Sequence, residues 1–172
     1  MMATARFIRP AAGLAAVFAA FSIACAQQTA PSGQDASAFV EGVTGHGQPD
    51  LATLDEIRDA GYGIVIDMRM PDEDRGLENE RQSVEERGMR YVSLPIDGGA
   101  GVTFENASKL NELLADLDQP AFVHCGSGNR AGALLALRAK LNGADNETAV
   151  EAGKQTGLTR LEDVVRQRLE ER

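Results

Sequence analysis

The segment from Pro120 to Leu135 constrains the fold most strongly, because its pattern predicts a short apolar strand, a glycine-rich turn and then a helix. Cys125 stands at the end of the strand, and Arg130 stands in the first turn of the helix. Helix N-termini and glycine-rich turns expose unpaired N–H groups, which bind anions and favour a thiolate over a thiol. The arginine adds a planar fork for an oxyanion. The segment therefore predicts a nucleophilic sulfur beneath a bound anion.

Strand and helix patterns alternate along the rest of the chain. Besides residues 121–124, strands are expected at 63–68 and 90–96, with a short edge strand at 39–43 and a turn at 45–49. Helices are expected at 51–60, 78–87, 103–117, 130–141, 147–155 and 161–170, the last started by a Thr159–Glu162 capping box. This alternation predicts an α/β fold, a three-layer α/β/α sandwich around a mostly parallel sheet that binds its ligand beyond the carboxyl ends of the strands.

The amino-terminal segment has the pattern of a targeting signal. Arg6 and Arg9 precede an apolar run from Ala11 to Ile23, and Ala24-Cys25-Ala26 fits a cleavage site. Residues 1–26 are thus expected to be a secretory signal peptide, with a lipoprotein signal lipidated at Cys25 as the alternative. Residues 27–38 are expected to be a flexible linker and 39–172 the catalytic domain, in a periplasmic or secreted protein.

Charge and composition exclude several classes of function. The chain has 26 Asp and Glu against 17 Lys and Arg, a net charge of −9, with 5% aromatic residues and no Trp, which argues against nucleic-acid binding. His46 and His124 are far apart in the sequence, so we expect no metal, and nothing indicates a cofactor. With Cys25 in the leader, Cys125 is the one thiol of the folded domain, so no disulfide is expected within it.

The segment His124–Gly132 resembles the active-site loop of protein tyrosine and dual-specificity phosphatases, H-C-x-x-G-x-x-R-[ST]-G, although it is one residue shorter. Its form, C-x-S-G-x-R, is similar to that of the beta-lactamase-hydrolase-like, phosphatase-like family. Three other stretches support this resemblance, which covers about residues 43–170: Gly47–Pro49, Val65–Arg69 and Arg90–Ile96. The short loop also resembles that of rhodanese sulfurtransferases, C-x-x-G-x-R.

The phosphatase resemblance implies a role for each residue of the loop. Cys125 would attack phosphorus and form a thiophosphoryl intermediate, and Arg130 would hold the phosphate oxygens. His124 would order the loop, and Asp97, in a glycine-rich turn, would protonate the leaving group, with Asp72, Glu73 and Asp74 as alternative acids. The residues expected to bind substrate are Gly126, Ser127, Gly128, Asn129 and Arg130.

Two features keep other functions open. Ala131 stands where the phosphatase pattern has a hydroxyl residue that assists breakdown of the intermediate, unless Ser127 substitutes for it. The shorter loop also suits a sulfurtransferase with a Cys125 persulfide, or a non-catalytic anion-binding module. The expected partner is a small-molecule or protein phosphoester, or a sulfane-sulfur donor, and a membrane contact is expected only through a lipid anchor.

Two charged segments are expected to be structural. Arg69 is expected to form an ion pair with a neighbouring acid rather than to contact substrate. The helix at 78–87 has a thin apolar face, so we expect it to be a solvated surface without a functional role.

Overall fold

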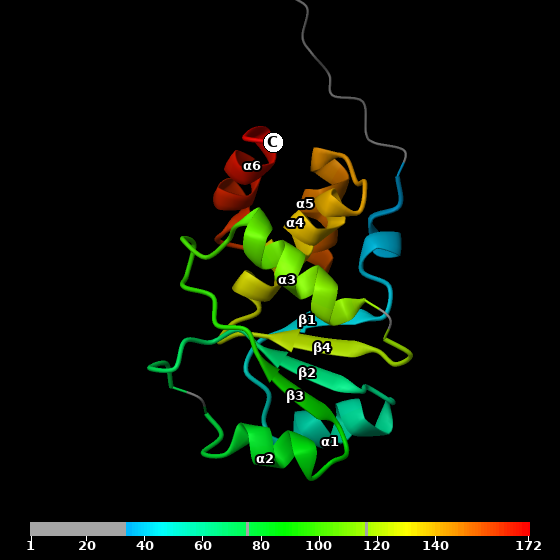
Figure 1. The fold of residues 1–172 in the computed structure, drawn as a ribbon, viewed down its shortest axis with the longest axis vertical. Coiled ribbons are helices and arrows are strands. Elements are labelled where there is room, and N and C mark those ends of the chain that lie inside the picture. Colours follow the sequence, from blue (N-terminus) through cyan, green and yellow to red (C-terminus); the bar gives the residue numbers. More distant parts are fainter. Residues whose placement is uncertain (1–33, 75, 116) are drawn as a thin grey trace, which may run out of the picture. The chain divides into compact units, whose positions relative to one another are not determined.

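A four-stranded, all-parallel sheet lies at the centre of the computed structural model, which describes residues 34–172 except positions 75 and 116 (Figure 1). The strands lie in the order β1-β4-β2-β3. Their bounds are Val43–His46 for β1, Ile64–Asp67 for β2, Arg90–Ser93 for β3 and Ala121–His124 for β4.

The two central strands are the most apolar ones, because helices cover them on both faces. Every residue of β2 and of β4 is buried. In their register Asp67 lies beside His124, the last residue of each strand. The carboxyl edge of the sheet thus brings two buried polar side chains together immediately before Cys125.

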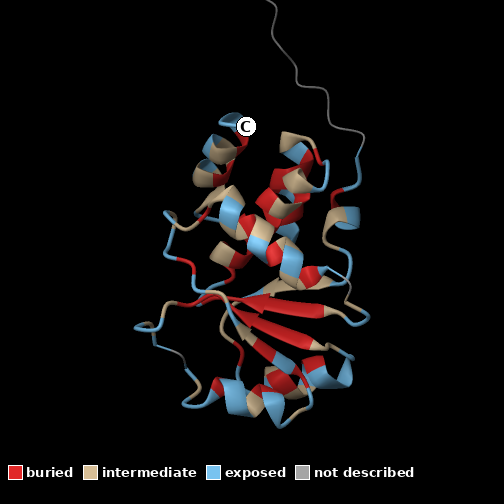
Figure 2. Ribbon diagram, viewed as in Figure 1, coloured by how far each residue is buried: buried red, intermediate tan, exposed pale blue. Residues whose placement is uncertain are grey.

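Helices cover both faces of the sheet, so the predicted three-layer α/β/α architecture is confirmed (Figures 1 and 2). One face carries α1 (Leu51–Asp59) and α2 (Glu80–Glu85) over a small core that includes Phe122. The other face carries the larger core, beneath α3 (Phe104–Leu114), α4 (Asn129–Leu141), α5 (Asn146–Gln155) and α6 (Glu162–Glu170).

Helix α4 is buried along most of its length because α5 approaches it very closely. A Cβ atom on Gly132 would lie 2.2 Å from the backbone nitrogen of Leu158 and 2.7 Å from the carbonyl oxygen of Gly153. Only glycine allows this approach. The packing fixes α4, and with it the loop that precedes the helix.

The edge strand predicted at 39–43 is wrong. Residues Ala36–Phe39 form a short 3-10 helix capped by Asp35, and the strand runs from Val43 to His46 through part of the predicted turn. Gly45 suggested a turn, but it lies in β1, where a Cβ atom would meet the Thr156 carbonyl oxygen at 2.0 Å. The glycine therefore marks a close backbone approach within a strand.

The boundary expected at residue 39 lies too late in the chain. Ala36 is buried in the larger core. The Gln34 side chain donates to the Gly143 carbonyl and accepts from the Asp145 N–H. Residues 34–38 therefore belong to the folded domain rather than to a linker.

The capping box predicted to start the last helix is also wrong. Helix α6 begins at Glu162 after an N-cap, Leu161, that makes no side-chain cap hydrogen bond. The Thr159 hydroxyl donates instead to Asn129, at the start of α4. A long-range contact has replaced the local cap.

The proposed leader, residues 1–26, and most of the expected linker lie outside the described residues. Within the part that the structure does describe, no helix is long and apolar enough to cross a bilayer.

Candidate active site

The loop between β4 and α4 carries the predicted reactive residues. Cys125 directly follows β4 and is buried, and Arg130 lies in the first turn of α4. Gly128, the N-cap of α4, has φ 84°, and a Cβ atom there would come within 3.3 Å of the His46 backbone. Glycine permits both the dihedral and the approach, so the amino end of α4 is placed beside Cys125.

The chain that leaves β1 holds the loop from behind. The Cys125 N–H donates to the His46 carbonyl at 3.3 Å, and the Gln48 N–H donates to the Gly126 carbonyl at 3.2 Å. The first N–H groups of α4 have no partners within the helix and form the positive end of its dipole. The loop therefore has the construction of a fixed anion cradle.

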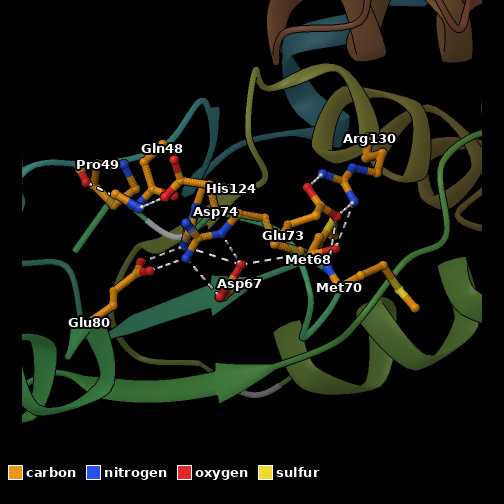
Figure 3. A network of polar contacts seen from close by, with 12 residues as sticks. Gln48, Pro49, Asp67, Met68, Met70, Glu73, Asp74, Glu80, His124 and Arg130 are labelled. Atoms are coloured by element: carbon orange, nitrogen blue, oxygen red, sulfur yellow. Dashed lines mark hydrogen bonds and ion pairs between the residues drawn. The ribbon is translucent and has the colours of Figure 1, made fainter. Parts of the chain in front are cut away.

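Arg130 donates hydrogen bonds to three residues from two other parts of the chain (Figure 3). Its Nη1 and Nη2 atoms donate to the two carboxylate oxygens of Glu73 at 2.5 and 2.6 Å. Nη1 also donates to the carbonyl of Ile96 at 2.9 Å and to that of Met68 at 3.4 Å. These contacts fix the guanidinium plane.

The bonds to Glu73 leave one edge of the Arg130 guanidinium for a ligand. Glu73 occupies the end-on edge, between Nη1 and Nη2. The side-on edge, formed by Nε–H and the other N–H of Nη2, donates to no oxygen of the described residues. The hydrogen bond to Glu73 raises the pKa of Arg130 against the effect of burial, and the Cys125 side chain raises it further by charge and hydrogen bonding. A Cβ atom on Gly126, the residue after Cys125, would lie 3.9 Å from Nη2 of Arg130, so the guanidinium stands next to the loop, where its side-on edge can bind an oxyanion.

Glu73, which the sequence indicated only as one of several alternative acids, contacts the predicted reactive arginine. The hydrogen bond from Arg130 lowers the pKa of Glu73 despite burial, and the N–H of Met70, which donates at 2.8 Å, lowers it further. A carboxylate held ionised in this way is a poor proton donor. We therefore assign Glu73 to the positioning of Arg130.

A buried polar cluster lies behind the loop (Figure 3). Arg69 is completely buried and donates to both carboxylate oxygens of Asp67 at 3.0 Å and to Glu80. Nε2 of His124, also fully buried, lies 2.8 Å from a carboxylate oxygen of Glu80 and 3.9 Å from Asp67. The ion pair expected for Arg69 is thus confirmed, and it extends to the residue before Cys125.

The ionised form of Asp67 is strongly favoured in this cluster. Burial would raise the pKa of its carboxyl group. Hydrogen bonds from the Arg69 side chain and backbone, a hydrogen bond from the Tyr91 hydroxyl and the charge of His124 outweigh that effect and lower the pKa to about 2. The Asp67 carboxylate therefore stays ionised at neutral pH, with Arg69 as its cation, beneath the loop.

The prediction that the helix at 78–87 is a solvated surface without a role is wrong for the observed helix α2. Glu80 is 4% exposed and contacts both Arg69 and His124. Side-chain oxygen or nitrogen atoms of Asp67, Glu80 and His124 lie within 4.8 Å of one another, as in a metal site. However, the Arg69 guanidinium already supplies a cation to both carboxylates.

A pocket of about 390 Å³ opens beside the loop. Its lining residues are Gly98, Ser127, Asn129, Arg130, Arg160 and Leu161. Asp97, the predicted acid, is exposed and lies between Gly98 and Ile96, which accepts from Arg130. The structure thus brings three predicted loop residues (Ser127, Asn129 and Arg130) and the segment that carries Asp97 to one pocket, whereas Cys125 is buried and is not among its lining residues. The Asp97 carboxylate makes no hydrogen bond or ion pair with the described residues.

Asn129 has a structural contact that the sequence did not indicate. Its side-chain oxygen accepts from the Thr159 N–H at 2.9 Å, the Thr159 hydroxyl at 3.3 Å and the Leu161 N–H at 3.3 Å. Asn129 is 7% exposed. Its carboxamide oxygen therefore links the loop to the turn before α6, beside the pocket that Asn129 also lines.

Curated relatives are similar over part of their length. A beta-lactamase hydrolase-like protein of Agrobacterium fabrum is 28% identical over 122 residues, which are 69% of this chain and 28% of that protein. A beta-lactamase hydrolase-like protein of Xylella fastidiosa is 28% identical over 109 residues, 62% of this chain and 25% of that protein. The chain thus spans about a quarter of the length of the curated relatives it matches.

Solved phosphatase structures share the fold. The core catalytic domain of a PP-IP phosphatase from S. cerevisiae has a TM-score of 0.59 at 14% identity, covering 77% of this chain and 81% of that one. Kinase associated phosphatase has a TM-score of 0.54 at 17% identity, covering 71% of this chain and 78% of that one. These structures confirm the phosphatase-like architecture.

A family model covers nearly the whole chain. It matches residues 14–168 and describes a DSP-PTPase phosphatase fused to NAD+ kinase. The match extends over both layers of helices and the loop at Cys125. The chain belongs to this DSP-PTPase phosphatase family, which confirms the resemblance drawn from the loop motif.

Proposed function

We propose that this phosphatase-family domain hydrolyses phosphomonoesters with Cys125 as the nucleophile. The observation that carries the proposal is that Cys125 directly follows β4 at the amino end of α4, and that Nη2 of Arg130 would lie 3.9 Å from a Cβ atom on the next residue, Gly126. A phosphate bound by the loop N–H groups and by the side-on edge of Arg130 would have its phosphorus next to the sulfur.

The first step forms a thiophosphoryl enzyme. The Cys125 thiolate attacks phosphorus and the bond to the ester oxygen breaks. Asp97 supplies the proton that the leaving oxygen needs. Arg130 and the loop N–H groups stabilise the charge on the remaining phosphate oxygens in the transition state.

The second step releases inorganic phosphate. Water attacks phosphorus, Asp97 accepts the proton, and the phosphorus–sulfur bond breaks to return the thiolate. Ala131 is fully buried and offers no hydroxyl for this step. Ser127, which lines the pocket, is the hydroxyl residue available within the loop.

Phosphate release from an aryl phosphate tests this proposal. We expect Cys125→Ser to abolish release while the variant still binds inorganic phosphate. Asp97→Asn should slow esters with poor leaving groups much more than activated aryl esters, since only the former need the proton. Equal effects on both kinds of ester would remove Asp97 from the acid role, and full activity of Cys125→Ser would refute the nucleophile.

The same protein also tests the sulfurtransferase alternative. With thiosulfate as donor and cyanide as acceptor, a persulfide on Cys125 would yield thiocyanate. We expect no Cys125-dependent thiocyanate. Thiocyanate formation without phosphate release would favour the sulfurtransferase. If neither product forms and the protein still binds phosphate, the domain would be a non-catalytic anion-binding module.

We further propose that the protein is exported. The basic residues Arg6 and Arg9, the apolar run and the site at Ala24–Ala26 support this proposal. Mass spectrometry of the mature protein is expected to find an N-terminus at Gln27. A lipid on Cys25 would favour the lipoprotein signal, and a chain retaining its first residues in the cytoplasm would refute export.

A further inference from the structure

A second arginine lines the candidate active-site pocket. Arg160 is exposed and lies in the turn between α5 and α6, far in the sequence from the loop. It lines the same pocket as Arg130 and Ser127. The phosphatase motif assigns Arg160 no role.

Contacts between the turn and the loop fix the place of Arg160. The residues on either side of it, Thr159 and Leu161, both donate backbone N–H groups to the Asn129 side-chain oxygen. Gly157 has φ 103°, and a Cβ atom there would lie 3.1 Å from the carbonyl oxygen of Gly128. The turn is therefore attached to the loop itself, and the two arginines are carried by one connected unit.

The charge of Arg160 is not used within the described part of the protein. Most other described arginines pair with carboxylates, as Arg166 does with Glu147 and Glu162. Arg160 makes no ion pair or hydrogen bond with the residues that the structure describes, although the chain is acidic, with a net charge of −9. The residues that line its pocket include two arginines and no acid. Such a pocket attracts anions, and each of its two guanidinium groups can bind an oxyanion.

We propose that Arg160 binds a second phosphate group of the substrate, so that the preferred substrates are organic bisphosphates. This inference rests on the proposed function. Arg130 and the loop would hold the phosphate that is hydrolysed, and Arg160 the phosphate that is retained. The pocket of about 390 Å³, which Gly98 and Leu161 also line, would hold the carbon linker between the two groups.

A series of synthetic substrates tests the proposal. Bisphosphates of straight-chain α,ω-diols are compared with the matching alkyl monophosphates, and kcat/KM for release of the first phosphate is measured for each linker length. We expect the wild-type protein to prefer a bisphosphate of one length. Arg160→Gln should lower kcat/KM for that bisphosphate about tenfold and change the monophosphate less than about twofold, since loss of one charge-assisted contact has about this effect.

Arg90→Gln is the matched control. Arg90 is exposed at the start of β3, the opposite edge of the sheet from the loop, and pairs with no described residue. The substitution removes the same charge, so a general electrostatic effect would appear in both variants. Circular dichroism and thermal unfolding should show both variants folded like the wild type.

Binding separates this inference from the proposed function. Calorimetry with the preferred bisphosphate is carried out on Cys125→Ser with and without Arg160→Gln. About tenfold weaker binding in the double variant supports the second phosphate site even if no ester is hydrolysed. Equal binding, an equal effect of Arg90→Gln, or equal loss for monophosphates and bisphosphates would overturn the inference while leaving Cys125 chemistry intact.

Discussion

The Glu73–Arg130 ion pair supports one prediction in detail. If Glu73 positions the guanidinium, Glu73→Gln should reduce both phosphate binding and turnover. If Glu73 instead blocked the anion site, the same substitution should tighten phosphate binding. The two roles therefore predict opposite changes in the affinity for phosphate.

The contacts of Arg130 set the magnitude. Glutamine keeps the acceptor for Nη1 but places a donor against Nη2, so the charge-assisted hydrogen bond of 2.6 Å from Nη2 is lost. Such a bond contributes about 1.5–3 kcal/mol. The Glu73 side chain is 33% exposed, so solvent screening lowers the expected effect to roughly 1–2 kcal/mol. The carbonyls of Ile96 and Met68 still hold Nη1, so we expect kcat/KM to fall about tenfold rather than to vanish.

The assay is aryl phosphate hydrolysis together with competitive inhibition by inorganic phosphate. The charge-matched control is Glu78→Gln, which should change kcat/KM less than about twofold. Glu78 is an exposed acid near the end of the same loop, and its side chain makes no hydrogen bond or ion pair with the described residues. Tighter inhibition by phosphate in Glu73→Gln would refute the positioning role, and so would unchanged kinetics.

Three further predictions concern stability, measured by urea unfolding. Arg69→Met leaves the buried carboxylates of Asp67 and Glu80 without their cation, and we expect a loss of about 3–5 kcal/mol, whereas a loss below about 1 kcal/mol would contradict the cluster. The folded pKa of Asp67, about 2, lies below its ordinary value of 3.8, so its contribution of roughly 2 kcal/mol is present above pH 4 and is lost as the pH falls toward 2. Asp67→Asn should remove this pH dependence, and an unchanged acid transition would argue against it. Gly132→Ala should destabilise the protein by about 1–3 kcal/mol, because its Cβ atom meets the backbone of Gly153 and Leu158. The same substitution in an open helix stabilises, so a gain in the free energy of unfolding would contradict the close packing of α4.

The strands, most helices and the loop could be predicted because local patterns determine them. The buried runs at β2 and β4 are apolar on both faces, and the glycine turn before Arg130 is a local signal. Glu80 could not be assigned, because only the fold shows which residue of a highly charged helix faces inward. Arg160 could not be assigned to the pocket for the same reason, since nothing near it in the sequence indicates that it lies beside the loop.

Gly45 and Thr159 illustrate the limit of predictions from local sequence patterns. Gly45 looks like a turn residue, yet it lies in a strand beneath Thr156. Thr159 and Glu162 match a capping box, yet Thr159 bonds to Asn129. In both cases a contact between distant parts of the chain outweighs a local preference that is weak on its own.

The backbone hydrogen bonds behind the loop have a consequence for binding entropy. The N–H of Cys125 donates to His46, the last residue of β1, and the carbonyl of Gly126 accepts from Gln48, two residues later. The loop cannot open without breaking these bonds, so it is ordered before any ligand arrives and little conformational freedom is lost on binding. In hydrogen exchange, the amides of Cys125 and Gln48 should therefore be as protected in the free protein as with phosphate bound.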